Sequence, residues 1–200
     1  MSLTSSVLVI CAHPAMHRSE INRPMFDIAS TINGVTAIDL YALYPNFHID
    51  IVTEQRRLLD HQVIIFQFPL FWYSMPALLK EWQDLILQYG FAYGKGGNSL
   101  VGKQLICAIS AGAQASAYSV TGDNHYPIAN YLLPIEQTAR LTQMQYHQPL
   151  VLYGAGLAKE DQRLASHLHH WQEFLIACVN HAGQASNLSE VLAGLKDKSQ

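Results

Sequence analysis

The chain has 200 residues, of which 50% are apolar and 14% are charged, and its formal net charge is −3. This length suits one domain with a full core, and this balance excludes a disordered chain. The small negative charge gives no case for a nucleic-acid partner, and three widely spaced cysteines do not form a disulfide framework. We therefore expect a globular cytoplasmic protein without a secretory signal or a membrane-spanning segment.

In chain order, apolar runs typical of buried strands alternate with amphipathic segments typical of helices. The predicted elements are a strand at 6–12, a helix opening near Ser19 or Asn22, a strand at 34–40, a loop at 41–50, a helix from Asp50 through Leu59, a strand at 62–68, a helix from Ser74 to Gly90, a strand at 103–110, a helix within 128–141, a strand at 149–154 and a helix from Lys159 to about Asn180. Pro24 and Pro134 should disturb the helices that contain them, because proline cannot donate a helical hydrogen bond.

Five strands that alternate with helices predict an α/β three-layer sandwich, in which helices cover both faces of a five-stranded parallel sheet. We expect one domain at 1–183 and a polar C-terminal tail at 184–200. Within that tail, four apolar side chains have the spacing of a short docking helix: Leu188, Val191, Leu192 and Leu195.

Parallel sheets of this kind bind ligands beyond the carboxyl ends of their strands, where the winding reverses. The segment after the first strand, 13–22, carries imidazole, guanidinium, hydroxyl and amide groups at the start of a helix. A helix N-terminus attracts phosphate, so this segment is a candidate phosphate site. Spacing alone favours the alternative, that Ser19 and Asn22 only cap the helix, and both interpretations remain open.

The loops after the third and fourth strands have unusual compositions. The third strand is followed by 70–76, with three consecutive aromatic residues that either form a wall for a flat ring or cover the end of the sheet. The fourth is followed by 110–118, whose small residues either admit a ligand to the backbone or form an ordinary turn. Together the three loops suit a mononucleotide with a large flat ring.

Two other patterns do not carry a function. The segment 154–159 approaches a dinucleotide-binding fingerprint, but Lys159 stands in place of its third glycine, and Glu173 lies within the following helix rather than at a strand end. Three histidines of the last helix lie close in sequence, yet no Cys or carboxylate pair completes a metal site, so no metal is expected: His167, His169 and His170.

Three motifs in combination resemble a known family. They are AHP with S-x-x-N after the first strand, FPLFWYSMPALLKEW after the third, and GFAYGKGGNSLVGK before the fourth. The set resembles the NAD(P)H:quinone oxidoreductase family of flavodoxin-like proteins. The segment DLYALYPNFHIDIVTEQRRLL is similar to the ancillary proteins of glutathione-regulated potassium-efflux systems, and the resemblance spans about residues 7–183.

The resemblance implies a flavodoxin-like domain that binds flavin mononucleotide (FMN), with FAD as the less favoured alternative. The implied cofactor-binding residues are His13, Ser19, Glu20, Ile21, Asn22, Leu70, Phe71, Trp72, Tyr73, Ser110, Ala111, Gly112 and Ala113. Tyr118 and His125 are the implied catalytic residues, Tyr118 as a hydrogen-bond donor to the reduced ring. Hydride would pass from NAD(P)H through the flavin to a quinone-like acceptor.

Two positions depart from the pattern of this family. Relatives often carry Thr-Thr-Gly-Gly where this chain has Ser110 to Ala113, and the Cβ of Ala113 disfavours a backbone that needs a positive φ. A histidine is expected six residues beyond Tyr118, but that position is Asn124, and His125 follows it.

The resemblance also implies a homodimer in which Phe91 and Tyr93 reach toward the partner's flavin. Three functions stay open: an oxidoreductase, a regulatory subunit at the cytoplasmic face of a membrane potassium-efflux antiporter, and a flavin-free binding module. The second function would make the protein peripheral at the inner face of the cell membrane.

Overall fold

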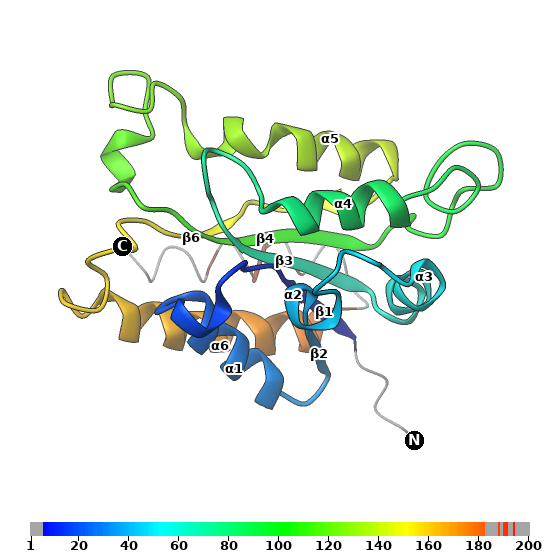
Figure 1. Ribbon diagram of the computed structural model, residues 1–200, viewed down its shortest axis with the longest axis horizontal. Helices are drawn as coiled ribbons and strands as arrows, with labels where there is room; N and C mark the ends of the chain where they lie inside the picture. Colours follow the sequence, from blue (N-terminus) through cyan, green and yellow to red (C-terminus); the bar gives the residue numbers. More distant parts are fainter. Residues whose placement is uncertain (1–5, 183–187, 189, 192–193, 195–200) are drawn as a thin grey trace.

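A parallel sheet with helices on both faces organises the structure, a computed structural model that describes residues 6–182, 188, 190, 191 and 194 (Figure 1). Its strands lie in the order β2, β1, β3, β4 and then β5 with β6, and every pairing is parallel. The strands are β1 Val7–Cys11, β2 Val35–Asp39, β3 Val63–Pro69, β4 Gln104–Ser110, β5 Gln145–Tyr146 and β6 Leu150–Leu152. The predicted three-layer α/β architecture is confirmed.

Helices cover both faces of the sheet (Figure 1). Helices α1 and α6 lie on one face and α4 and α5 on the other, with α2 and α3 toward the β2 edge (Figure 1). The helices are α1 Asn22–Thr31, α2 Leu40–Leu43, α3 Ile51–Asp60, α4 Ala77–Ile86, α5 Leu133–Leu141 and α6 Arg163–His181. Short 3-10 turns occupy Met16–Arg18, Ala115–Ala117 and Ile128–Leu132.

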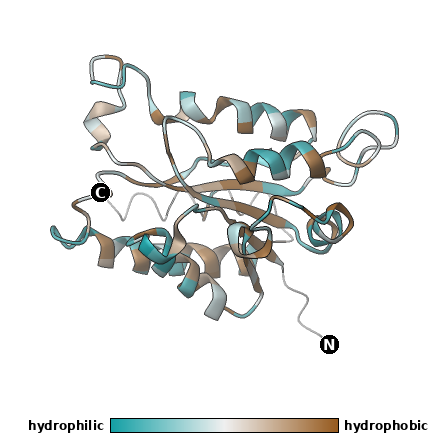
Figure 2. Cartoon of the chain, in the orientation of Figure 1, coloured by the Kyte–Doolittle hydropathy of each residue, from teal (hydrophilic) through white to brown (hydrophobic). Residues whose placement is uncertain are grey.

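Alternate side chains of each strand enter two separate apolar clusters. Leu8 and Ile10 of β1 pack under α4 and α5, whereas Val7 and Val9 pack against α1 and α6. Because both faces are covered, β1, β3 and β4 are buried along their whole length and are mostly apolar, as the hydropathy colouring of the sheet shows (Figure 2). Leu188 is helical and belongs to the second cluster, and Val191 is helical; Leu192 and Leu195 lie outside the described residues.

Several boundaries differ from the prediction. The fifth strand is divided: β5 pairs with the start of β4 and β6 with its end, and 147–149 interrupt them. Helix α6 begins at Arg163 rather than Lys159, because Gln162 has a left-handed backbone. The predicted loop 41–50 contains most of α2, which Asp39 caps, and α4 ends at Ile86 rather than Gly90.

The two prolines fit their helices. Pro24 lies in the first turn of α1 and Pro134 in the first turn of α5, where helical N–H groups have no intrahelical acceptor. The expected disturbance is therefore wrong for α1, and at Pro134 the proline instead marks the change from a 3-10 turn to an α-helix.

A fully buried carboxylate joins α3 to α4. Glu54 is 0% exposed and accepts hydrogen bonds from Tyr44 Oη at 2.7 Å, Trp82 Nε1 at 3.1 Å and Arg57 Nε at 3.0 Å. A buried carboxylate is tolerated when it is paired and hydrogen-bonded, as here.

We expect Glu54→Ala to lower the free energy of unfolding by about 3–5 kcal/mol, because it leaves Trp82 Nε1 buried without an acceptor. Urea denaturation measures the loss. The control is Arg23→Ala, which breaks the half-exposed Arg23–Asp27 pair and should cost less than about 1 kcal/mol. Equal losses in the two variants would contradict the importance of the buried carboxylate.

Candidate functional site

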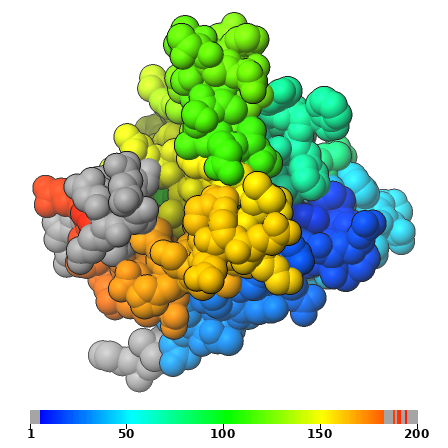
Figure 3. All heavy atoms as spheres, turned by 90° about the vertical axis from the view of Figure 1, so that its left-hand side faces the viewer, coloured from blue at the N-terminus to red at the C-terminus, as the bar shows by residue number. Residues whose placement is uncertain are grey.

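The loops that follow β1, β3 and β4 meet at the carboxyl edge of the sheet. Leu70 donates its backbone N–H to Ser110 O at 2.8 Å, and Asn22 Nδ2 donates to Ser110 Oγ at 3.0 Å. The rings of His13 and Phe71 are in edge contact, with centroids 5.7 Å apart. Figure 3 shows this side of the molecule, where the loop after β4 (green) stands above the segment that follows β6 (yellow), with the segment after β1 (blue) beside them.

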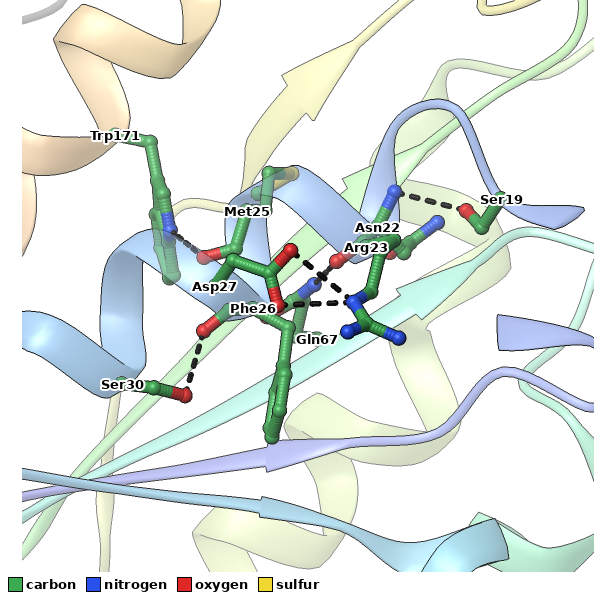
Figure 4. Close-up of polar contacts among 9 residues, drawn as sticks. All are labelled: Ser19, Asn22, Arg23, Met25, Phe26, Asp27, Ser30, Gln67 and Trp171. Atoms are coloured by element: carbon green, nitrogen blue, oxygen red, sulfur yellow. Dashed lines mark hydrogen bonds and ion pairs between the residues drawn. The ribbon is translucent and has the colours of Figure 1, made fainter. Parts of the chain in front are cut away.

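The start of α1 shows what Ser19 and Asn22 do. Ser19 Oγ accepts from the Asn22 N–H at 2.9 Å, so Ser19 satisfies the first N–H of α1 although the N-cap position itself is Ile21 (Figure 4). Asn22 is 1% exposed, so its side chain is held inside the protein, and its backbone carbonyl accepts from Gln67 Nε2 at 2.8 Å. The capping interpretation therefore holds for Ser19, and any phosphate would meet the backbone and hydroxyl groups here rather than the Asn22 amide.

Two buried oxygens at this edge lack donors. Asn22 Oδ1 and Gln67 Oε1 have no hydrogen-bond partner within the described part of the chain. Buried amide oxygens normally have a donor, so a molecule with hydroxyl or N–H groups would complete this corner of the site.

The other residues of this segment have separate contacts. Glu20 is exposed and pairs with Lys159 Nζ at 3.1 Å, and Ile21 is buried in the second apolar cluster. His13 Nδ1 accepts from the Ala15 N–H at 3.1 Å. Burial lowers the pKa of His13, opposed by Asp39 and aided by His17, so the ring is neutral near pH 7 with its proton on Nε2.

The aromatic residues after β3 form a tight, strained turn. Ser74 N–H donates to Phe71 O at 3.1 Å, and the two central residues have positive φ, 48° at Trp72 and 64° at Tyr73. Bulky residues rarely adopt this backbone, and such strain is found most often at functional sites. The turn uses neither central N–H for its own closure, so both are available to the edge of a flat ligand.

The same turn exposes its rings. Phe71 is 47% exposed, Trp72 92% and Tyr73 48%, whereas the adjoining Leu70 is buried. The alternative in which these aromatics cover the end of the sheet is wrong for Trp72, which lies almost wholly in solvent.

The loop of small residues after β4 is held by backbone hydrogen bonds and leaves the backbone at Gly112 accessible. Ala111 N–H donates to Leu152 O, and Gly154 N–H donates to Ala113 O, both at 2.8 Å, which fixes the loop against the end of β6. Gly112 is exposed, and a Cβ placed on it would meet no atom within 4 Å. Neither Gly112 nor Ala113 has a positive φ, so the cost that we expected from Ala113 is absent.

The two predicted catalytic residues differ in their burial. Tyr118 is half-buried and contacts the rings of Tyr131 and Tyr153, with centroids 6.0 and 5.6 Å away. Burial, with Tyr73 and Tyr131 nearby, raises the pKa of Tyr118, so its phenol stays a donor at neutral pH. His125 is exposed, and its φ of 61° places it at the tip of a tight turn.

Sequence reasoning missed three members of this region. Tyr131 stacks on Tyr73, Tyr126 packs edge-on against Tyr131, and Tyr153 contacts Tyr118. A density of tyrosines along 118–131 was the available signal, but Tyr153 comes from the end of β6 and gave none.

The glycine-rich loop before β4 folds partly on itself. Phe91 is half-buried and packs against the first apolar cluster of its own chain. Tyr93 is 37% exposed and Tyr89 66%, and their rings meet edge-on at 5.8 Å. Gly97 lies so close to Tyr93 that a Cβ would be 2.1 Å from Tyr93 O, so only glycine closes this loop.

All three cysteines are buried, and burial raises the pKa of each thiol. Among the residues whose positions are described, no group of three His, Cys, Asp or Glu side chains could hold a metal ion. Across these same residues, no helix combines the length and apolar character needed to cross a bilayer.

Comparisons with known proteins agree with this architecture. Residues 5–175 match a family described as having a flavodoxin-like fold. The glutathione-regulated potassium-efflux system ancillary protein KefG of Cronobacter sakazakii is 46% identical over 175 residues, which cover 88% of this chain and 95% of that protein.

Solved structures show the same fold with differing names. General stress protein 14 of Treponema denticola, in complex with FMN, is 33% identical with a TM-score of 0.77, covering 84% of this chain and 98% of that one. An NADPH-quinone reductase from P. pentosaceus is 31% identical with a TM-score of 0.75, covering 84% and 96%. A protein described as a thermophilic tryptophan halogenase from Streptomycin violaceusniger is 43% identical with a TM-score of 0.81, covering 83% and 96%.

The names of these proteins do not agree on one reaction. All of them match this chain over more than four fifths of its length. The chain belongs to the flavodoxin-like family that includes the KefG ancillary proteins and NAD(P)H:quinone oxidoreductases.

Proposed function

We propose that this protein is an FMN-dependent oxidoreductase that transfers hydride from NAD(P)H to a quinone-like acceptor. The observation that carries the proposal is the strained turn 71–74, which exposes aromatic rings and backbone N–H groups beside the start of α1 and the open Gly112. FMN bound there would accept hydride from the nicotinamide and pass it to the acceptor.

The residues present fit this cofactor. The backbone and hydroxyl groups at Ser19 to Asn22 would hold the phosphate at a helix N-terminus, and the unpartnered Asn22 Oδ1 would accept from a ribityl hydroxyl. The turn at 71–73 and the loop at 110–113 would border the flat ring. The FMN complex of general stress protein 14 from Treponema denticola supports FMN over FAD.

Two side chains are placed for the acceptor. The protonated Tyr118 phenol would donate to negative charge that develops on the reduced ring or on the acceptor oxygen. His125, at an exposed tip, would act only if an acceptor or a partner subunit brought the reacting oxygen to it.

A second function has its own support. The similarity to KefG extends over 95% of that protein, so this chain can also be an ancillary subunit that docks at the cytoplasmic face of a potassium-efflux antiporter. Regulation by docking and reduction of a quinone are compatible, and co-purification with the antiporter would distinguish a subunit from an independent enzyme.

The absorption spectrum of the purified protein tests the main proposal. A flavin band that bleaches on anaerobic addition of NADPH or NADH, and returns on addition of a quinone, is the expected result. A colourless protein that takes up no FMN would leave only a flavin-free binding function.

Ser19→Ala should weaken FMN binding by about tenfold or more, because a hydrogen bond to a charged phosphate contributes about 1.5–3 kcal/mol. Loss of the cap alone should cost the protein about 1 kcal/mol of stability without FMN. Flavin fluorescence titration measures the affinity. Ser30→Ala, which removes an exposed hydroxyl bonded to Phe26 O within the same helix, is the control and should leave the affinity unchanged (Figure 4).

Trp72 should be strongly quenched when FMN binds, because its 92% exposed ring lies where the flavin would stack or meet its edge. The measurement is the emission difference between the wild type and Trp72→Phe, with and without FMN. The remaining tryptophans, Trp82 and Trp171, are both 0% exposed and provide the internal reference. A Trp72 contribution that FMN does not change would contradict this placement.

We propose that the protein is a two-fold dimer in which the loop 89–97 helps to close the partner's flavin site. Tyr89 and Tyr93 form the exposed aromatic surface of this loop, and such surfaces mark interfaces. Phe91 is half-buried against the first apolar cluster, so Tyr89 and Tyr93 present the more exposed aromatic rings of this loop.

Changing both Tyr89 and Tyr93 to serine should weaken the dimer and lower NAD(P)H-driven quinone reduction together. Sedimentation at several concentrations, alongside activity, measures both quantities. Val52→Ser removes a 72% exposed apolar residue of α3 and serves as the control that should change neither. A wild type that is monomeric and fully active at every concentration excludes the shared site.

A further inference from the structure

Asn124 has four hydrogen-bond partners around the candidate site, three in the stretch after β4 and one in the loop after β3. Its N–H donates to Ala117 O at 3.0 Å, and its carbonyl accepts from Tyr126 N at 2.8 Å and Tyr131 Oη at 2.5 Å. Its side chain contacts a different loop: Asn124 Oδ1 accepts a hydrogen bond at 3.2 Å from Tyr73 Oη, in the loop after β3.

The loop after β4 is closed by its own backbone. Gly122 packs so tightly on the opposite side of this loop that a Cβ would lie 2.3 Å from Ser116 O and 2.6 Å from Ala117 O. The N–H groups of Gly122 and His125 donate to Ser119 O and Gly122 O. These bonds use no side chain of Asn124, so the contact with Tyr73 is not needed to fold the loop.

The Tyr73 contact instead links two tyrosine-bearing segments. Tyr73 stacks on Tyr131 with ring centroids 5.1 Å apart and an interplanar angle of 25°, and Tyr118 and Tyr126 pack edge-on against Tyr131. We call these four residues the tyrosine wall. Tyr73 also belongs to the strained turn, and a strained backbone persists only where its surroundings hold it.

We propose that Asn124 is a positioning residue for the acceptor: its side chain holds the Tyr73 ring against Tyr131 within the tyrosine wall and so sets where a flat acceptor ring lies. This inference rests on the proposed function, since this position matters only if a flat acceptor is reduced there. Asn124 touches no reacting atom in this role and acts through Tyr73.

The test is a double-mutant cycle in the FMN-loaded protein, with NADPH as donor and 1,4-naphthoquinone as acceptor. Asn124→Leu removes the acceptor oxygen at nearly constant volume, and Tyr73→Phe removes the donor hydroxyl. Each should raise the KM for naphthoquinone about fivefold, the size of one lost hydrogen bond. Asn124→Leu should leave kcat and FMN affinity within about twofold, which a general loss of structure would not do.

The double variant should have the same KM as either single variant, because both remove the same contact. Asn124→Asp keeps an oxygen for the Tyr73 hydroxyl and should restore the wild-type KM. Tyr131→Phe is the matched control: it loses a bond to the backbone carbonyl of Asn124, so its effect should multiply with that of Asn124→Leu. Multiplying effects of Asn124→Leu and Tyr73→Phe, or a fall in FMN affinity as the main change, would overturn the proposal.

A wild type that reduces no naphthoquinone would refute the proposed function itself. The link between Asn124 and Tyr73 is then measured by chymotrypsin cleavage after Trp72, which is 92% exposed in the turn that contains Tyr73. Faster cleavage by the same factor in both single variants and in the double variant supports the positioning role. Cleavage rates equal to the wild type overturn it.

Discussion

Ser110, the last residue of β4, is the point at which the loops of the site are joined. Its carbonyl accepts from Leu70 at the end of β3, and its hydroxyl accepts from Asn22 at the start of α1. Because parallel strands end at one edge of the sheet, a single residue there can contact the chain after β1 through its side chain and the chain after β3 through its backbone. The positions of the helix N-terminus, the aromatic turn and the small-residue loop all follow from this junction.

The strands and the location of the site could be predicted because both follow from local patterns. Apolar runs such as 62–68 have few alternatives to a buried strand, and the winding rule then places the site. The division of the last strand could not be predicted, because it depends on 145–146 and 150–152 pairing with opposite ends of β4. The start of α6 was also hidden, because the Arg163 guanidinium bonds to Tyr153 O and Gly154 O and fixes the chain before it.

Contacts within the site were less accessible to sequence reasoning than its place. The segment 111–132 has no periodic pattern, so nothing in it indicates that Tyr131 stacks on Tyr73 or that Asn124 accepts from the same ring. At Ala113 the sequence suggested a strained backbone that the structure does not have, because Ala113 has no positive φ. Side chains that act across loops require coordinates, whereas caps such as Asp50 and Ser19 do not.

The divided strand at the far edge of the sheet has a consequence for how copies of the chain meet. An uninterrupted edge strand presents a row of unpaired backbone groups on which another chain can add a strand, the first step of aggregation. Here β5 has two residues and β6 three, and the interruption 147–149 contains Pro149, which has no N–H to donate. Neither piece is long enough to align an incoming strand, so this edge resists uncontrolled polymerisation while the carboxyl end of β6 still supports the site.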